Sequence, residues 1–244
     1  MMSAAVTPDR YVAYSGTATL PHSTEFLYGE QNVLHYRDGR LAERVTLYTC
    51  RSGRPFARKT VVYADPLAPD FLLEDTSTGL REGVRSEGGA RVVFFRRVRV
   101  EPEKSSPVPM VPGLVVDAGF DEFIRTHWDG LAQAKGLDMR FLVPSRLESL
   151  NFQVQRVRAD TIDGIAVEVF RLTFTGVLGL VLPGIDVSYS ADDHVLMGYE
   201  GLSDLRDAAG NNFRISILFH SIDRRMATEE ENSAARQAPL GLCK

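Results

Sequence analysis

The feature that most constrains this chain is a repeated alternation of apolar and polar residues over short stretches. It is clearest in Phe213–Ile217, and it recurs in residues 150–155 and 170–175. Successive side chains of a strand point to opposite faces, so this alternation is typical of half-buried antiparallel strands. One face of such a sheet covers the core and the other meets water. The sequence therefore predicts a mainly β protein.

Turn-forming pairs separate these stretches. Asp38-Gly39, Ser52-Gly53 and Asp163-Gly164 each stand between two apolar runs, and such pairs favour tight hairpins. Residues 207–212 include Gly210 and Asn211, which adopt positive φ at little cost, and they predict another hairpin. We therefore expect strands that are adjacent in sequence to pair, and the last third of the chain to form a meander.

One segment has the period of a helix. Apolar residues at helical spacing predict an amphipathic helix over residues 120–135, with acidic residues in its first turn. Asp117 or Gly119 is the expected N-terminal cap, and Gly136 is the expected stop. The apolar face comprises Phe120, Phe123, Ile124, Trp128 and Leu131, and the opposite face comprises Asp121, Glu122, Arg125 and Asp129. The expected fold is mainly β (α+β), a large curved antiparallel sheet or half-open barrel wrapped around one amphipathic helix.

The 244 residues fit one large β domain. Residues 102–112 hold four prolines, which remove ladder donors, so we expect a loop there at the rim of the sheet. The strand pattern is the same before and after this loop. We therefore expect an N-terminal tail over 1–10, a single β-rich domain over 11–222 and a C-terminal tail over 223–244, either frayed or forming a short helix.

Charge and composition exclude several classes of function. The net charge is -4 and the acidic and basic residues are interspersed, which argues against nucleic-acid binding. No run approaches the roughly 20 apolar residues of a membrane-spanning helix, and residues 1–10 lack the apolar core of a signal peptide. As written, the chain is expected in the cytoplasm, or in the bacterial periplasm if a signal peptide precedes it. Whether Cys50 and Cys243 pair stays open, as does the oligomeric state.

The sequence contains no recognisable catalytic or metal-binding motif. A Gly-x-Ser-x-Gly elbow is absent, and Asp192-Asp193-His194 is interpreted as a polar turn because consecutive strand residues point apart. The carboxylate pairs Glu74-Asp75 and Asp121-Glu122 are interpreted as solvated side chains. We therefore expect no catalytic residue, no metal ligand and no cofactor.

An apolar, glycine-rich stretch over residues 175–185 is too short to span a bilayer. It is either a buried edge of the core or a rim over a hydrophobic pocket. A curved sheet with aromatic and aliphatic residues inside, covered by a Trp-bearing helix, offers a place for an apolar ligand between sheet and helix. The candidate ligand-binding residues are Phe123, Ile124, Trp128, Phe152, Leu172 and Phe174.

This layout, a long antiparallel meander with a helix inserted after its first half, resembles the half-open barrels of bacterial lipoprotein-carrier proteins and similar exported proteins. The resemblance extends over most of residues 11–220. It implies an exported protein that shields an acyl chain or lipid-like ligand on its concave face, with the helix as a lid.

The leading hypothesis is a non-enzymatic binding protein for an apolar or amphiphilic small molecule such as a lipid. One alternative is a protein-interaction or assembly module that uses the apolar 177–185 segment or a sheet edge. Another is a hydrolase or metal-dependent enzyme whose groups converge from distant strands.

Overall fold

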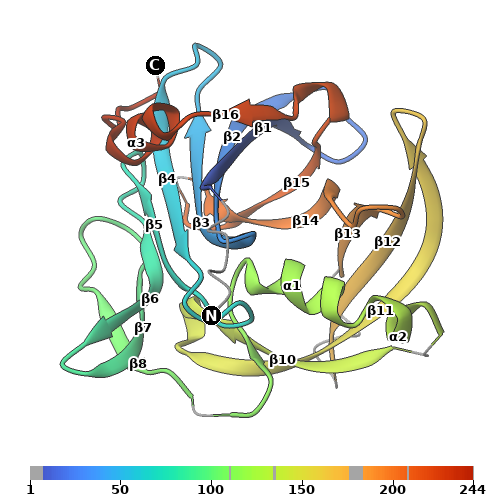
Figure 1. Ribbon diagram of the computed structural model, residues 1–244. Coiled ribbons are helices and arrows are strands. Elements are labelled where there is room, and N and C mark those ends of the chain that lie inside the picture. The colour runs from blue at the N-terminus through green and yellow to red at the C-terminus, as the bar shows by residue number, and fades with distance from the viewer. Residues whose placement is uncertain (1–7, 110, 134–135, 176–183, 208, 244) are drawn as a thin grey trace, which may run out of the picture.

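The computed structural model describes residues 8–109, 111–133, 136–175, 184–207 and 209–243. These residues form one large curved sheet that wraps around two short helices (Figure 1). The strands of the first half are β1 (Arg10–Thr19), β2 (Phe26–Arg37), β3 (Arg40–Thr49), β4 (Pro55–Val62), β5 (Asp70–Asp75), β6 (Arg81–Glu87), β7 (Ala90–Arg96) and β8 (Lys104–Pro107). The strands of the second half are β9 (Leu114–Val115), β10 (Leu137–Val143), β11 (Glu148–Ile162), β12 (Ile165–Phe174), β13 (Ile185–Ser190), β14 (Leu196–Arg206), β15 (Asn212–Leu218) and β16 (Arg225–Ala227). The helices are α1 (Gly119–Thr126), α2 (Trp128–Gln133) and α3 (Glu229–Gln237), and two 3-10 turns, η1 (Pro144–Arg146) and η3 (Ser221–Asp223), connect strands.

The sheet is built from two antiparallel meanders. From β8 to β1 the spatial order follows the chain, β1 then pairs with β15, and the order continues down to β10 and to β9, which is parallel to β10. The strand β16 pairs with the other end of β1. This arrangement confirms the predicted mainly β fold and the large curved antiparallel sheet.

Among the residues that the structure describes, the two edges of the sheet approach each other without pairing. Apolar side chains from β4 to β7, such as Val61, Phe71 and Val84, pack with Leu114 and Leu142 from β9 and β10. Burial of this surface stabilises the curvature in place of ladder hydrogen bonds. The sheet is therefore curled almost into a barrel, with its seam closed by side chains.

The predicted hairpins are present at the expected turns. Asp38 and Gly39 have φ of 50° and 76°, and Asp163 and Gly164 have φ of 55° and 78°. Two consecutive residues with positive φ form the turn whose twist matches antiparallel strands. They join β2 to β3 and β11 to β12.

The proline-rich segment over 102–112 was expected to be a loop, and that expectation was wrong in part. Residues Lys104–Pro107 form β8, which pairs with β7 at the edge of the sheet. Proline is tolerated at an edge because the missing donor faces away from the ladder.

The helix expected over 120–135 is two helices rather than one. α1 ends at Thr126, and His127 has φ of -106° and ψ of 14°, outside the helical region. α2 then begins at Trp128, while residues 134–135 lie outside the described part of the chain. Both helices lie inside the curve of the sheet (Figure 1).

The segment after residue 223 packs on the outside of the sheet. A capping box at Thr228 and Glu231 starts α3, and Ala235 of this helix is buried with Val33, Val45 and Leu47 on the outer face of β2 and β3. Beyond α3 the chain runs to Cys243, which forms a disulfide with Cys50. The pairing left open by the sequence is thus present, and it joins the C-terminal segment to the end of β3.

Candidate binding site on the concave face

The six residues expected to contact a ligand lie together. Phe123, Ile124, Phe152 and Leu172 are buried in one cluster, and Trp128 and Phe174 pack against it half-buried. The structure therefore brings α1 and α2 onto the inner face of β10 to β13. We call this the aromatic cluster; its buried members are Val115, Phe120, Phe123, Ile124, Leu131, Met139, Phe152, Val154, Phe170, Leu172, Val187 and Tyr189.

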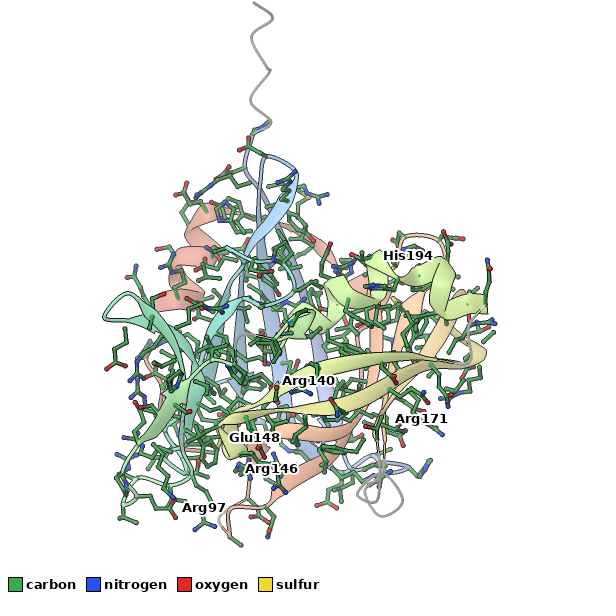
Figure 2. All side chains as sticks on the ribbon, turned by 90° about the horizontal axis from the view of Figure 1, so that it is seen from below. Arg97, Arg140, Arg146, Glu148, Arg171 and His194 are labelled. Carbon is green, nitrogen blue, oxygen red and sulfur yellow. A yellow bond between two sulfur atoms is a disulfide. The ribbon has the colours of Figure 1, made fainter. Side chains whose placement is uncertain are left out.

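Trp128 sits at the boundary of the aromatic cluster. Its ring stacks on His194 with 3.7 Å between centroids, and it meets the edge of Phe170 at 5.0 Å. Figure 2 shows His194 beside the two helices. The turn expected at 192–194 is present: residues 191–193 form a turn, and His194 follows with a positive φ of 56°. Aromatic stacking of this kind holds α2 against β13 and β14.

A buried ion pair joins α1 to β3 of the first half of the sheet. Arg44 Nη2 of β3 donates to Asp121 Oδ2 at 2.5 Å, and Tyr189 Oη donates to Asp121 Oδ1 at 2.6 Å. Asp121 was predicted to be solvated, and this was wrong, because only 7% of it is exposed. Burial would raise the pKa of Asp121, but Arg44 and the two hydrogen bonds lower it below its usual value, so the carboxylate is charged.

A second ion pair lies just before α1. Lys59 Nζ donates to Asp117 Oδ1 at 2.9 Å and to Asp204 Oδ2 of β14 at 2.7 Å. Asp117 was an expected cap of the helix, but the N-cap is Ala118, which makes no side-chain cap, and Asp117 pairs with Lys59 instead. Burial would lower the pKa of Lys59, and its two carboxylates raise the pKa well above the usual value. Lys59 therefore links β4, in the first half of the sheet, to β14 in the second half and to the residue that lies two positions before α1.

Lys59 belongs to a row of inward-facing polar residues. The strand registers place Asn32 opposite Thr46, Thr46 opposite Lys59, Lys59 opposite Leu73, and Leu73 opposite Glu82. Residues directly opposite in a ladder share a face of the sheet. The interior thus carries a row across β2 to β6 that is polar except at Leu73, beside the aromatic cluster of the second half.

Two carboxyl groups near this row are held in an unusual state. Burial, with a smaller contribution from Asp204, raises the pKa of Glu82 to about 8. Burial likewise raises the pKa of Glu30, on β2, to about 7, with Lys59 opposing the shift. Both groups therefore retain protons near neutral pH far more than a solvated glutamate does.

No sequence pattern indicated these interior charges directly. Val45 and Leu47 are apolar but lie under α3 on the outer face, so Arg44 and Thr46 face inward. The alternation of β3 was readable, yet the apolar residues were on the face opposite to the one that α1 occupies. The only indication in the sequence was that Arg44 and Thr46 alternate with the apolar Val45 and Leu47 along β3.

The expected apolar segment over 177–185 lies mostly outside the described residues. Ile185 begins β13 and packs half-buried against the aromatic cluster. This contact is with the concave face of the sheet.

Two hollows are present on the described surface. A polar groove of about 1050 Å³ is lined by hydroxyl-bearing residues of β1 and β15, together with Glu30, Arg51 and His220. A second cleft of about 670 Å³ lies where β7 meets η1 and the β14–β15 turn, lined in part by Phe95, Leu147 and Arg206. Phe95, one of the lining residues of the second cleft, lies directly opposite Glu82 in the ladder and shares its face of the sheet.

Within the described residues, no group of three or more His, Cys, Asp or Glu side chains is arranged to hold a metal ion. No helix in that part of the chain is long and apolar enough to cross a membrane.

Comparison with known proteins found matches only among solved structures. No protein-family model matches the chain, and no curated protein matches it. A β-barrel-like protein of a domain of unknown function from Brucella abortus is 11% identical, with a TM-score of 0.49, covering 92% of this chain and 100% of that chain. A putative outer membrane lipoprotein-sorting protein domain from Vibrio parahaemolyticus is 9% identical, with a TM-score of 0.34, covering 93% and 90%. A LolA superfamily protein from Nitrosomonas europaea is 10% identical, with a TM-score of 0.23, covering 92% and 88%.

The chain is similar in layout to lipoprotein-carrier-like half-barrel proteins. This likeness agrees with the resemblance expected from the sequence. At these identities and TM-scores the likeness concerns the layout of the fold and says nothing about ligand or activity.

Proposed function

We propose that the protein binds the apolar chain of a lipid-like molecule between α1–α2 and the inner face of β10 to β14. The observation that supports this is the make-up of the aromatic cluster. Its wall is a continuous sheet, whereas its cover consists of helices of only eight and six residues. The ligand-binding residues proposed are the six expected from the sequence: Phe123, Ile124, Trp128, Phe152, Leu172 and Phe174.

α2 is the more displaceable part of the cover. It is a six-residue helix held by burial of Leu131 and by the stack of Trp128 on His194, whereas α1 is also fixed by the buried Arg44–Asp121 pair and the Tyr189 hydrogen bond. An apolar chain that entered between helix and sheet would exchange one set of apolar contacts for another, at little cost in buried area. Flexible, loosely anchored cover elements are typical of binding sites that admit ligands.

The single tryptophan gives a direct test. The protein is titrated with a terminally brominated long-chain alcohol and with its unbrominated analogue, and Trp128 emission is recorded. Bromine quenches only on close contact, so we expect saturable quenching by the brominated chain alone. Absence of quenching at every soluble concentration would contradict the proposal.

A second measurement uses the protein as cells make it. Native mass spectrometry followed by solvent extraction should identify an apolar molecule that leaves with the protein. Trp128→Ala should reduce its amount without unfolding the protein, whereas Ile222→Ala, at a side chain that is 89% exposed, should not. Equal loss in both variants would count against the site.

A further inference from the structure

The cleft of about 670 Å³ between β7, η1 and the β14–β15 turn has a basic wall. Arg97, Lys104 and Arg206 line it from separate parts of the chain. Among the described residues that line it, only Glu101 carries a carboxylate, so two positive charges are in excess. The protein as a whole has a net charge of -4, so this excess is a local feature. A concave surface with a local positive charge attracts anions.

The side chains of the two arginines meet at the β14–β15 turn. Arg206 Nη1 donates to the carbonyl oxygen of Gly210 at 3.1 Å. A Cβ on Gly210 would lie 3.1 Å from Arg97 Cδ, so the Arg97 side chain packs on the same residue. Gly210 has a φ of 86°, which glycine adopts without strain. One turn thus brings two guanidinium-bearing side chains together.

The carboxylate of the cleft neutralises only one of the three cations. Nε and Nη2 of Arg97 both donate to Glu101 Oε1, at 3.1 and 2.6 Å. Lys104 and Arg206 form no ion pair with any residue in the described ranges, and this includes Glu82 on the neighbouring strand β6. The charges of Lys104 and Arg206 are therefore available to a ligand.

Arg206 is held in a fixed orientation on this wall. Its guanidinium lies over the ring of Phe95 at 5.3 Å, in addition to its bond to Gly210. Its Nε is buried without a partner in the described part of the chain, and its Nη2 donates to no residue there. A guanidinium fixed on a ring keeps its planar fork of donors in place, which suits the oxygens of a phosphate or carboxylate. The protein itself leaves these donors incompletely satisfied.

The rest of the cleft is largely apolar. Pro102 and Leu147 line it, together with Ser145 of η1, whose hydroxyl group bonds to no described residue. Figure 2 shows Arg146, which lies between Ser145 and Leu147, at the same end of the molecule as Arg97. A volume of about 670 Å³ lies within the range of roughly 300–1,000 Å³ that is usual for small-molecule sites. Apolar surface beside cations suits an anion that carries a carbon skeleton.

We propose that this basic cleft, defined by Arg97, Lys104, Ser145 and Arg206, binds the phosphate group of an organic phosphate monoester. Such a group carries a charge of about -1.5 to -2 at pH 7, which matches the excess of two positive charges. None of the described residues that line the cleft belongs to the aromatic cluster, so the inference does not rest on the proposed function. The phosphate belongs either to the head group of an amphiphile or to a soluble organic phosphate.

Isothermal titration calorimetry with phenyl phosphate, and with phenol as its neutral analogue, tests the site. We expect saturable binding of phenyl phosphate and at least about tenfold weaker binding of phenol, which corresponds to about 1.4 kcal/mol. Binding of phenyl phosphate should weaken as sodium chloride is added, because salt screens the attraction. Equal affinities for the two probes, or no binding of phenyl phosphate at millimolar concentrations, would overturn the proposal.

Three variants locate the binding. Arg206→Gln should weaken binding of phenyl phosphate by about tenfold or more, because a charge-assisted hydrogen bond is lost. Lys104→Gln changes an exposed side chain of the edge strand β8, which leaves the fold intact, and should weaken binding by about threefold or more. The control Arg40→Gln removes a positive charge from an exposed residue at the start of β3 and should leave the affinity unchanged. An affinity that is unchanged in either cleft variant, or equally lowered in Arg40→Gln, would rule out this cleft as the site.

Dodecyl phosphate, used below its micelle-forming concentration, distinguishes the two sources of the phosphate. If it binds at least about tenfold more tightly than phenyl phosphate and displaces the brominated alcohol from Trp128, the phosphate is the head group of the amphiphile. If it binds no more tightly and leaves the quenching of Trp128 unchanged, the ligand is a soluble organic phosphate. Both results support the cleft as a phosphate site. Absence of quenching by every brominated chain contradicts the proposed function and leaves this inference intact, provided that phenyl phosphate binds.

Discussion

At the residue scale, Asp121 shows how a local pattern misassigns a side chain. The helical period placed it on the polar face of residues 120–135, and its partners Arg44 and Tyr189 lie 77 and 68 residues away in the sequence. A periodic pattern reports which face is polar but not whether that face meets water or a buried cation. Phe123 and Ile124 were correctly predicted to lie on the apolar face of the helix, and both are buried. An apolar face is buried wherever the helix packs against a hydrophobic core.

Removing the carboxylate of Asp121 is expected to be costly. Asp121→Ala leaves Arg44 buried without its counter-ion, and breaking a buried pair in this way costs about 3–5 kcal/mol. Urea unfolding of the variant measures the loss. The control Asp129→Ala, at an exposed residue of α2, should change stability by less than about 0.5 kcal/mol. A similar effect in both variants would show that Arg44 finds another partner.

Glu82 gives the stability a pH dependence of defined sign. Its pKa is raised by burial to about 8 in the folded protein, so the folded state binds more protons than the unfolded state between its ordinary pKa of 4.5 and about 8. Stability contributed by this group is therefore fully present below the unfolded pKa and lost as the pH rises through the folded pKa.

Replacing Glu82 should remove this loss. We expect Glu82→Gln to be more stable than the original protein at about pH 9, by on the order of 2–4 kcal/mol, and about equal at pH near 4.5. Thermal melts across this pH range measure the difference. A constant difference at all pH values would mean that Glu82 does not titrate in the interior.

At the scale of elements, strands and hairpins could be predicted because their signals are local. The Asp-Gly turns at 38–39 and 163–164 need only their own backbone conformation. The edge strand in 104–107 and the break at His127 could not be predicted, because each depends on a neighbour. β8 exists because β7 offers an unpaired edge, and at the break the His127 ring stacks on Phe123 with Nδ1 2.9 Å from the Phe123 carbonyl oxygen.

Two glycines in the helical cover are expected to respond in opposite ways. A Cβ on Gly119 would lie 2.0 Å from the carbonyl oxygen of Leu67, whereas one on Gly130 would meet nothing within 4 Å. Gly119→Ala should destabilise the protein by about 1–3 kcal/mol through overpacking. Gly130→Ala should stabilise it by up to about 1 kcal/mol, because alanine is the better helix former. Chemical denaturation of both variants checks the pair, and a destabilised Gly130→Ala would contradict the position given to α2.

At the scale of the whole molecule, the sequence predicted the meander and the helix inside it, but not how the sheet closes. The seam depends on Val61, Phe71 and Leu142 meeting across a gap between strands far apart in the chain. The ion pair between Lys59 of β4 and Asp204 of β14 depends likewise on two strands that are far apart in the chain. Such placements follow from curvature, which no local pattern encodes.

The disulfide is the covalent link at this scale. It joins residues 193 apart and fastens the segment after α3 to the end of β3. Disulfides persist in oxidising compartments and are rare in the reducing cytosol. Protein taken from its native cells should therefore resist thiol alkylation until it is reduced.

Loss of the disulfide should destabilise the fold mainly because the unfolded chain then gains conformational entropy. A bond that closes a loop of this length restricts the unfolded ensemble strongly, so Cys243→Ser should lower stability by about 2–5 kcal/mol. The melting temperature of the original protein should fall to a similar extent on addition of a reductant. The double variant Cys50→Ser with Cys243→Ser is the control, because a reductant should leave its melting temperature unchanged. If the original protein melts at the same temperature with and without reductant, the disulfide does not stabilise the fold. The segment after α3 is then held by its hydrogen bonds to Arg54, Arg58 and Thr76.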